Sequence, residues 1–377
     1  MNTNTTHWTS IWGNAVSIAE NRLESYSKNI TLRYPIYSHF AGTAIRLTFD
    51  NYCGTEAITI SKTTILINNE FVSITFNNNL SVTIPAGERI VSDEIKCNVL
   101  AKNIFFVSFY LEDYTQMRSM VYASGPLSTG IFAISDCTME REIPINISRN
   151  TNNFYFLSNV SVLTEPQNRC IVCYGDSITA QDWPNYLSLR CREEGYNHTS
   201  VIRRATSGSR ILREYHDITY ESYGLKGTNR FEHEVPTDGA DTVIIQQGIN
   251  DIIHPVGVEV NPFRPMSDMP TLEELIDGMK YYISKARSYG YKVYLGTLLP
   301  IEGWRTYADF REKLRNEFND WMRTTDLVDG CIDFDKALCD PDNPSAFLPI
   351  YDSGDHLHPS KEGYKKMAET VSAEILN

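Results

Sequence analysis

The strongest constraint on the fold of this 377-residue chain is a change of pattern near residue 166. Before it, short runs of β-branched and aromatic residues are separated by Gly, Asn and Pro, which is typical of a domain built of strands alone. After it, short apolar runs alternate with stretches of helical periodicity, which predicts a parallel sheet covered by helices. We therefore expect an all-β domain over 1–165 and an α/β domain over 166–377.

The all-β part is expected to form a sandwich of jelly-roll type, because its strands are closely spaced and no helical stretch interrupts them. Its densest apolar run, Ile104–Leu111, is expected to lie in the core. The other expected strands are Ala44–Phe49, Ala57–Ile60, Thr64–Ile67, Phe71–Phe76 and Leu80–Ile84.

The α/β part is expected to be doubly wound. Its expected strands are Cys170–Tyr174, Val201–Arg204, Thr242–Gln246, Lys292–Leu298 and Gly330–Phe334, and its expected helices are Trp183–Glu194, Leu272–Ser288, Tyr307–Arg323 and Lys361–Leu376. In such sheets the ligand site lies beyond the carboxyl ends of the strands. Side chains that directly follow a strand are therefore the first candidates for chemistry.

Charge and hydropathy restrict the partners. The net charge of −13 disfavours nucleic acids and anionic membranes, since both require a basic surface. The polar start MNTNTTHWTS has no Lys or Arg and no apolar run after it, so we expect no signal peptide and a cytoplasmic protein. The longest apolar runs have the length of a strand and are too short to span a membrane.

The cysteines and glycines argue against a metal or a nucleotide cofactor. Of the eight cysteines, only Cys170 and Cys173 form a C-x-x-C pair, and they lie inside an expected strand with no second pair to complete a zinc site. We expect buried thiols. The chain contains neither a G-x-G-x-x-G loop nor a P-loop, so no cofactor is expected.

Polar residues suited to catalysis follow successive expected strands. Ser177 follows the first strand, Gly208 the second and Asn250 the third, while Asp355 and His358 precede the last helix. The i, i+3 spacing of Asp355 and His358 allows the carboxylate to orient the imidazole. Each feature alone is also common in turns and helix caps, but their joint appearance in this order is specific.

With these motifs, residues 169–377 resemble the SGNH (GDSL) hydrolase family. GDSIT at 175–179 matches the first block of the family, Gly208 the second, GIND at 248–251 the third and DHLHP at 355–359 the last. The resemblance implies a flavodoxin-like three-layer fold and serine hydrolase chemistry. More loosely, Thr6–Trp12, Ile45–Asn51 and Ser81–Ser92 resemble the β-sandwich that precedes the SGNH domain in bacterial two-domain carbohydrate esterases.

The expected mechanism is that of a serine esterase acting through an acyl-enzyme. Ser177 is the expected nucleophile and His358 its general base, with Asp355 orienting the imidazole. The backbone N–H groups of Ser177 and Gly208 and the side-chain amide of Asn250 are expected to hold the oxyanion. His356 is an alternative base, although its place directly after Asp355 aims it elsewhere.

The expected substrate is a short acyl ester, chiefly acetyl, carried on an oligosaccharide. Trp183, Trp304 and Tyr307 offer aromatic faces for sugar rings. A lipase, arylesterase or lysophospholipase of the same family is the first alternative, but such an enzyme would need a broad apolar lid, whereas the His254–Pro270 loop is rich in proline and carries Arg264 and Asp268. A carbohydrate-binding protein with little hydrolysis is the second, and the complete set of catalytic residue types argues against it.

Overall fold

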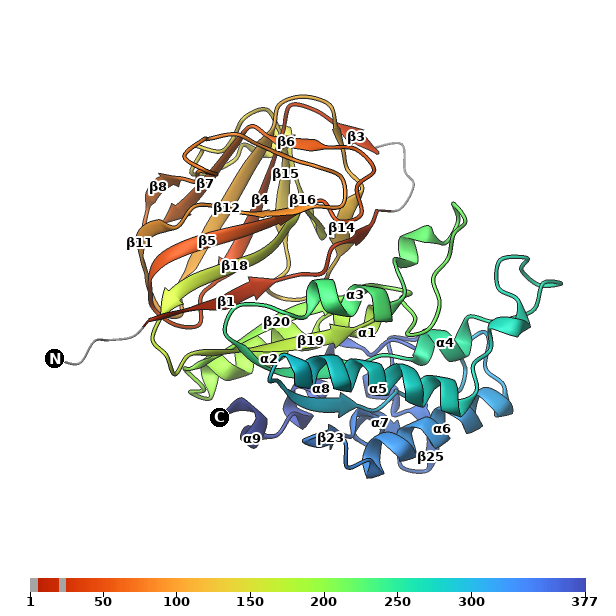
Figure 1. Cartoon of the computed structure of the whole chain (residues 1–377). Helices are drawn as coiled ribbons and strands as arrows, with labels where there is room; N and C mark the ends of the chain where they lie inside the picture. Colours follow the sequence, from red (N-terminus) through yellow and green to blue (C-terminus); the bar gives the residue numbers. More distant parts are fainter. Residues whose placement is uncertain (1–5, 20–24) are drawn as a thin grey trace. The chain divides into compact units, whose positions relative to one another are not determined.

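The computed structural model describes residues 6–19 and 25–377. Residues 1–5, part of the polar start on which the signal-peptide expectation rests, lie outside the described residues. The chain packs as two compact units (Figure 1). The first comprises Met1–Cys170, Glu194–Ile202 and Thr237–Gly239, and the second comprises Ile171–Glu193, Arg203–Pro236 and Ala240–Asn377. Three short segments of the expected α/β range, 166–170, Glu194–Ile202 and Thr237–Gly239, therefore group with the first unit.

The first unit is rich in antiparallel strands, as expected. Its strands are β1 His7–Gly13, β2 Ser17–Ile18, β3 Tyr26–Ser27, β4 Ile30–Tyr37, β5 Gly42–Asp50, β6 Ile58–Ile60, β7 Lys62–Ile67, β8 Glu70–Ser73, β9 Val82–Ile84, β10 Arg89–Val91, β11 Ile95–Val99, β12 Ile104–Leu111, β13 Thr115–Gln116, β14 Ser119–Tyr122, β15 Gly130–Ile134, β16 Ser148–Thr151, β17 Asn153–Tyr155 and β18 Leu157–Thr164. One large sheet has the order β1-β18-β5-β10, with β11 also paired to β5, and the other has the order β16-β15-β4-β12-β7-β8. A jelly-roll connection of these strands stays a prediction.

The core of the first unit lies between its two large sheets. Alternate residues of β5 are fully buried, and Phe49 is the last of them, as the period of two in a strand requires. Its ring meets that of Phe109 from β12 edge-on, with centroids 5.1 Å apart. Because β5 and β12 belong to different sheets, this contact joins the two sheets.

The second unit is built on a five-stranded sheet. Its strands are β19 Arg169–Gly175, β20 Thr199–Ala205, β21 Ala240–Gln246, β22 Lys292–Gly296 and β23 Gly330–Ile332, and a small hairpin is formed by β24 Cys339–Asp340 and β25 Asn343–Phe347. The strand order is β20-β19-β21-β22-β23, which is the order of flavodoxin-like sheets. The pairs β21–β22 and β22–β23 are parallel.

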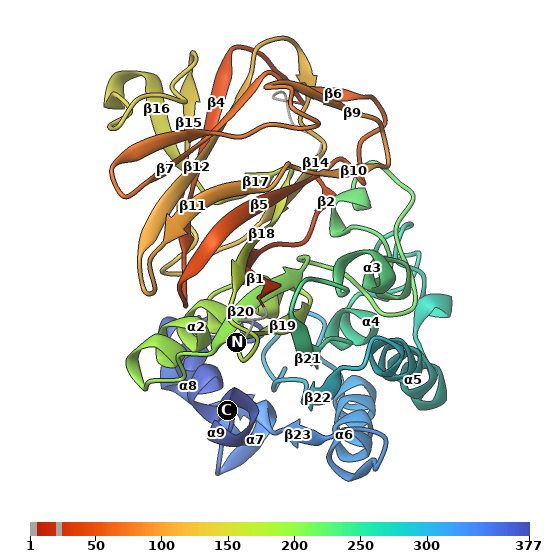
Figure 2. The ribbon, with the colours of Figure 1, turned by 60° about the vertical axis from the view of Figure 1, so that its left-hand side comes forward.

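Helices cover both faces of this sheet (Figure 2). They are α1 Ser177–Ala180, α2 Trp183–Glu193, α3 Gly227–Glu234, α4 Ile249–Ile253, α5 Leu272–Ser288, α6 Asp309–Thr324, α7 Phe334–Leu338, α8 Lys361–Thr370 and α9 Ala373–Leu376. Helices α2 and α8 pack together on one face, and α3, α5 and α6 lie on the other. The expected helices include none of α1, α3, α4 and α7, and Phe334, the first residue of α7, was expected to end a strand.

Local sequence explains where two of these helices end. The α5 range was predicted without error, because Thr271 and Glu274 form a capping box at its start and Gly290, with φ of 81°, follows its end. The expected closing helix Lys361–Leu376 is instead two helices. Val371 between them is extended, with ψ of 122°, and its side chain is fully buried, so core packing overrides helix continuation there.

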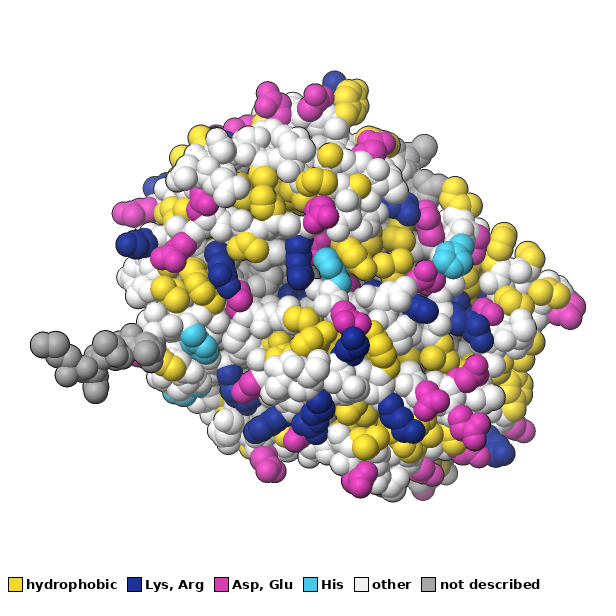
Figure 3. Space-filling view, viewed as in Figure 1, with side chains coloured by type: hydrophobic (Ala, Val, Ile, Leu, Met, Phe, Trp, Pro, Cys, Tyr) yellow, Lys and Arg dark blue, Asp and Glu magenta, His cyan; other side chains and the backbone are white. Residues whose placement is uncertain are grey.

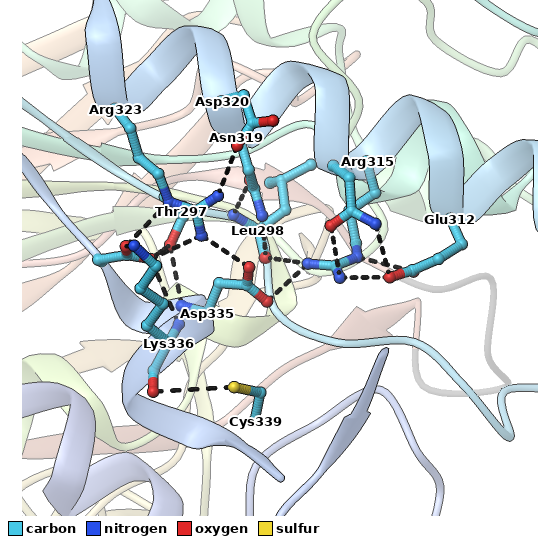
Figure 4. A network of polar contacts seen from close by, with 12 residues as sticks. Thr297, Leu298, Glu312, Arg315, Asn319, Asp320, Arg323, Asp335, Lys336 and Cys339 are labelled. Atoms are coloured by element: carbon cyan, nitrogen blue, oxygen red, sulfur yellow. Dashed lines mark hydrogen bonds and ion pairs between the residues drawn. The ribbon is translucent and has the colours of Figure 1, made fainter. Parts of the chain in front are cut away.

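A buried ion network joins α6 to α7 and to the chain after β22 (Figure 4). The Arg315 guanidinium pairs with Glu312 and with Asp335, at 2.6 and 2.7 Å, and donates to the backbone carbonyl of Leu298 at 2.9 Å. Arg323 pairs with the same Asp335 at 2.8 Å. Each buried charge has partners, so that removing one of them would leave another charge buried and uncompensated, and the Arg315 contact fixes the start of the turn that follows β22.

The surface charge, the helices and the cysteines of the described residues relate to the partners and cofactors considered above. On the face drawn in Figure 3, Lys and Arg side chains are interspersed with Asp and Glu. None of the helices described is both long and apolar enough to cross a membrane. Within residues 6–19 and 25–377, no three His, Cys, Asp or Glu side chains are grouped so as to hold a metal ion. Cys170 and Cys173 are buried thiols.

Candidate active site

Ser177 lies where β19 ends and α1 begins. At Gly175, the last residue of β19, a Cβ atom would stand 2.3 Å from the backbone oxygen of Gln246 in β21, so only glycine allows the two strands this approach. Asp176 then caps α1, its side chain accepting a hydrogen bond from the Ile178 backbone at 3.1 Å. The strand end and the cap together fix the start of α1, where Ser177 is 8% exposed.

The hydroxyl of Ser177 contacts an imidazole, which in turn contacts a carboxylate. Ser177 Oγ lies 2.9 Å from His358 Nε2, and His358 Nδ1 lies 2.7 Å from Asp355 Oδ2. The other Asp355 oxygen accepts the backbone N–H groups of Leu357 and His358, at 2.9 and 2.8 Å. This is the order of contacts that activates a serine as a nucleophile.

Hydrogen bonding keeps the Asp355 carboxyl ionised. Partial burial raises the pKa of this group, but the hydrogen bonds from the His358 side chain and from the backbone of His358 and Leu357 outweigh it, so the pKa lies well below its usual value. An ionised Asp355 can hold a proton on Nδ1 of His358, which leaves Nε2 able to accept a proton from Ser177.

Three donors suited to an oxyanion come from three different loops. The N–H of Ser177 is at the first position of α1, where no intrahelical acceptor exists. Gly208 follows β20, and in the described part of the chain its backbone N–H donates to no other backbone group. Asn250 is 3% exposed in α4, and its amide nitrogen carries two hydrogens, one of which donates to the Ser209 carbonyl at 3.1 Å.

Hydrogen bonds join these loops to one another. The Thr206 backbone N–H donates to the Gly175 carbonyl at 3.2 Å, which connects the loop after β20 to the end of β19. Asp251, next to Asn250, accepts the backbone N–H groups of Ile211 and Leu212 at 2.7 and 3.0 Å. Burial raises the pKa of Asp251 to about 6. The loops after β20 and β21 are therefore held together by buried polar groups.

An aromatic group that the sequence analysis did not predict covers Gly208. Gly208 has φ of 77°, and a Cβ atom there would stand 2.3 Å from the ring of Tyr223. That ring stacks on His254, with centroids 5.1 Å apart, and Tyr215 lies edge-on to Tyr223 at 5.8 Å. The concentration of tyrosines over 215–223, between two motif blocks, was the signal available for it.

One predicted substrate-binding residue has to be dropped. Trp183 has no exposed surface; its indole N–H donates to Thr179 Oγ1 at 3.3 Å and its ring lies against Phe334, with centroids 5.5 Å apart. A ring without exposed surface cannot stack on a sugar, so Trp183 belongs to the core. A tryptophan at a helix start is compatible with either place, and the sequence does not distinguish them.

The other two predicted substrate-binding residues lie on one partly exposed turn after β22. The Trp304 backbone N–H donates to Ile301 and the Tyr307 N–H donates to Trp304, at 3.0 and 2.8 Å. Both side chains are partly exposed. The indole N–H of Trp304 is buried and has no hydrogen-bond partner among the described residues, and the Arg305 guanidinium lies over the Trp304 ring, 4.5 Å from its centroid.

This turn meets the loop that carries Asp355 and His358. A Cβ atom on Gly303 would stand 2.7 Å from the His356 ring. His356 itself does not reach Ser177 in the described hydrogen bonds; its Nδ1 lies 2.6 Å from Asp352 Oδ2. The imidazole next to Ser177 is thus that of His358, and Asp352 is a partner that the sequence analysis missed.

Comparisons with known proteins indicate a family. A family model described as the GDSL-like Lipase/Acylhydrolase family matches residues 173–366. No curated protein matches the sequence. Solved structures that are similar include a GDSL-like lipase from Bacteroides thetaiotaomicron, 17% identical with a TM-score of 0.38, covering 55% of this chain and 87% of that one.

Two further solved structures are similar to the same extent. An α/β hydrolase from the metagenome of Lake Arreo, Spain, is 18% identical, with a TM-score of 0.40, covering 55% of this chain and 96% of that one. An acetyl xylan esterase is 19% identical, with a TM-score of 0.38, covering 53% and 96%. The family assignment rests on the family model, which spans just over half of the chain and includes Ser177 and His358. The chain belongs to the GDSL-like lipase/acylhydrolase family, as its sequence motifs indicated.

Proposed function

We propose that this member of the GDSL family is a serine esterase that removes short acyl groups, chiefly acetyl, from the hydroxyl groups of a carbohydrate. The single observation that carries the reaction type is the contact chain from Ser177 Oγ through His358 to Asp355, at 2.9 and 2.7 Å. It supports nucleophilic attack on an ester, because the imidazole is within reach of the proton it must take.

The reaction has two halves. Ser177 Oγ attacks the ester carbonyl while its proton moves to His358 Nε2, and collapse of the tetrahedral intermediate expels the alcohol, which takes that proton. Water, deprotonated by His358, then attacks the acyl-serine and releases the carboxylic acid and free Ser177. During both halves the Ser177 and Gly208 N–H groups and the Asn250 amide stabilise the negative oxygen.

The surroundings of these donors support a small acyl group and a polar alcohol. The Tyr223 ring lies directly over Gly208, which restricts the room beside one proposed oxyanion donor. The turn with Trp304 and Tyr307 carries partly exposed aromatic rings, and the Arg305 guanidinium lies over the Trp304 ring, 4.5 Å from its centroid. Aromatic faces with hydrogen-bond donors suit a sugar ring better than a long acyl chain.

The deciding experiment compares two measurements on the purified protein. Acetate release from acetylated xylo- and manno-oligosaccharides is followed beside the hydrolysis of chromogenic esters from acetyl to octanoyl. We expect acetate from at least one oligosaccharide and a decline in kcat/KM as the acyl chain grows. Preference for octanoyl with no acetate from any oligosaccharide would replace the proposal with a lipase or arylesterase function. The Ser177→Ala variant serves as the blank in both assays.

A further inference from the structure

The loop that carries the general base contains a second histidine–aspartate pair, which the mechanism above does not use. The loop runs from Asp352 to Pro359, closed by a backbone bridge between these two residues and by a hydrogen bond from Ser353 N to the His358 carbonyl at 3.1 Å. Within it, His358 serves Ser177, whereas His356 pairs with Asp352.

His356 occupies a backbone position that suits glycine better. Its φ is 63°, in the left-handed region that costs free energy for any residue with a Cβ atom. Asp352 offsets that cost, since its Oδ1 accepts the backbone N–H groups of Gly354 and His356, at 2.8 and 3.1 Å. The loop thus supports an imidazole where a glycine would fit without strain, which points to a role for the side chain itself.

The imidazole is held so that one nitrogen remains available. Nδ1 is occupied by Asp352 Oδ2 at 2.6 Å, and the His356 side chain is 47% exposed. Among the described residues, no hydrogen bond is recorded for Nε2. One part of the ring lies against Gly303, at the start of the turn with Trp304. A carboxylate that fixes one ring nitrogen determines which way the other points.

The place of His356 relates it to the alcohol part of the ester. His358, two residues later, must reach the leaving alcohol with the same Nε2 that contacts Ser177. The turn with Trp304 and Tyr307, which the proposed function assigns to the alcohol, is the one that His356 contacts through Gly303. We propose that His356 Nε2 forms a hydrogen bond with a hydroxyl group of the leaving alcohol and so selects polyhydroxylated alcohols.

This inference rests on the proposed esterase function but not on the alcohol being a sugar. The first test therefore uses two acetates that differ in the hydroxyl groups of the alcohol, glycerol monoacetate and propyl acetate. The measured quantity is the ratio of their kcat/KM values. In the His356→Gly variant, which also relieves the positive φ, we expect this ratio to fall about 3- to 10-fold, the effect of one hydrogen bond.

Two further variants separate recognition from loop structure. Lys102→Gly removes a side chain at a similar φ of 58° in the first unit, and we expect its ratio to equal that of the wild type. His356→Asn keeps a short polar side chain in a conformation that Asn tolerates, and we expect a ratio between those of wild type and His356→Gly. Circular dichroism and thermal unfolding establish that each variant is folded.

The outcomes assign the role without ambiguity. An unchanged ratio in a folded His356→Gly variant overturns the inference. This holds even if kcat/KM falls for both esters, because a loss of loop geometry alone lowers both kcat/KM values by the same factor. Acetate release from oligosaccharides is measured separately on the wild type. If the wild type releases none while the ratio still falls in His356→Gly, the carbohydrate proposal fails and the role of His356 stands. If the wild type releases acetate and the ratio does not change in His356→Gly, the carbohydrate proposal stands and the role of His356 fails.

Discussion

The side-chain amide of Asn250 donates a hydrogen bond to the backbone carbonyl of Ser209 at 3.1 Å, so that two loops that follow different strands are fastened beside Gly208. One amide hydrogen anchors Asn250, and the nitrogen carries a second one, which the proposed function assigns to the oxyanion. A donor that is already anchored needs no reorganisation when negative charge develops, which is the property that makes such groups effective in catalysis.

Replacing Asn250 by alanine should therefore lower kcat by roughly 10²–10³-fold with little change in KM, the usual cost of one oxyanion donor. Steady-state kinetics on 4-nitrophenyl acetate measure both constants. A rise in KM at constant kcat would assign Asn250 to ground-state binding instead.

Ser177→Ala should abolish ester hydrolysis and leave the free energy of unfolding nearly unchanged. The only side-chain hydrogen bond of the Ser177 hydroxyl among the described residues is with His358, which is itself partly exposed. Turnover and urea unfolding of the same sample provide the two readouts. Turnover at the wild-type rate in a folded sample of Ser177→Ala would end the assignment of Ser177 as nucleophile.

The buried carboxyl of Asp176 should make stability depend on pH. Burial raises the pKa of Asp176 to about 7, whereas an aspartate in an unfolded chain has a pKa of about 3.9. Between these values the folded chain keeps a proton that the unfolded chain has released. The contribution of Asp176 to the free energy of unfolding is therefore fully present below pH ~4 and is lost as the pH rises to ~7.

Asp176→Asn is the matched variant, because the amide keeps an oxygen for the Ile178 N–H and does not ionise. We subtract the free energy of unfolding of Asp176→Asn from that of the wild type. This difference should decline between pH 4 and 7 by about 1.4 kcal/mol for each pH unit. Urea unfolding at several pH values measures it. The same slope in both proteins would mean that Asp176 titrates normally.

Trp183 and Trp304, both predicted from the sequence to bind substrate, should differ in what their replacement changes. Trp183→Phe should lower the free energy of unfolding by about 1–3 kcal/mol, because it leaves a space in the core and removes the bond to Thr179. Trp304→Ala should instead raise KM for an acetylated oligosaccharide about 3- to 10-fold, the loss of one aromatic contact. A KM effect of Trp183→Phe without loss of stability would contradict its place in the core.

Periodicity and local chemistry in the sequence determine much of the fold. The dense apolar run Ile104–Leu111 and the amphipathic run Leu272–Ser288 were placed without error, because the residue pattern that marks each element lies within the segment itself. The division at Val371 was missed, because burial of its side chain depends on what packs around it.

For the candidate site, the sequence alone determined which residue types follow which strands, and the family follows from that order. Which groups touch was decided by the tertiary structure. Ser177 and His358 are 181 positions apart, and the spacing around Asp355 left both His356 and His358 as possible bases. Packing of segments that are remote in sequence brings Nε2 of His358 to Ser177 and buries Trp183, whereas His356 pairs with Asp352 within the same loop. The physical reason is that residue type and spacing act along the chain, whereas contact and burial depend on neighbours that are remote in sequence.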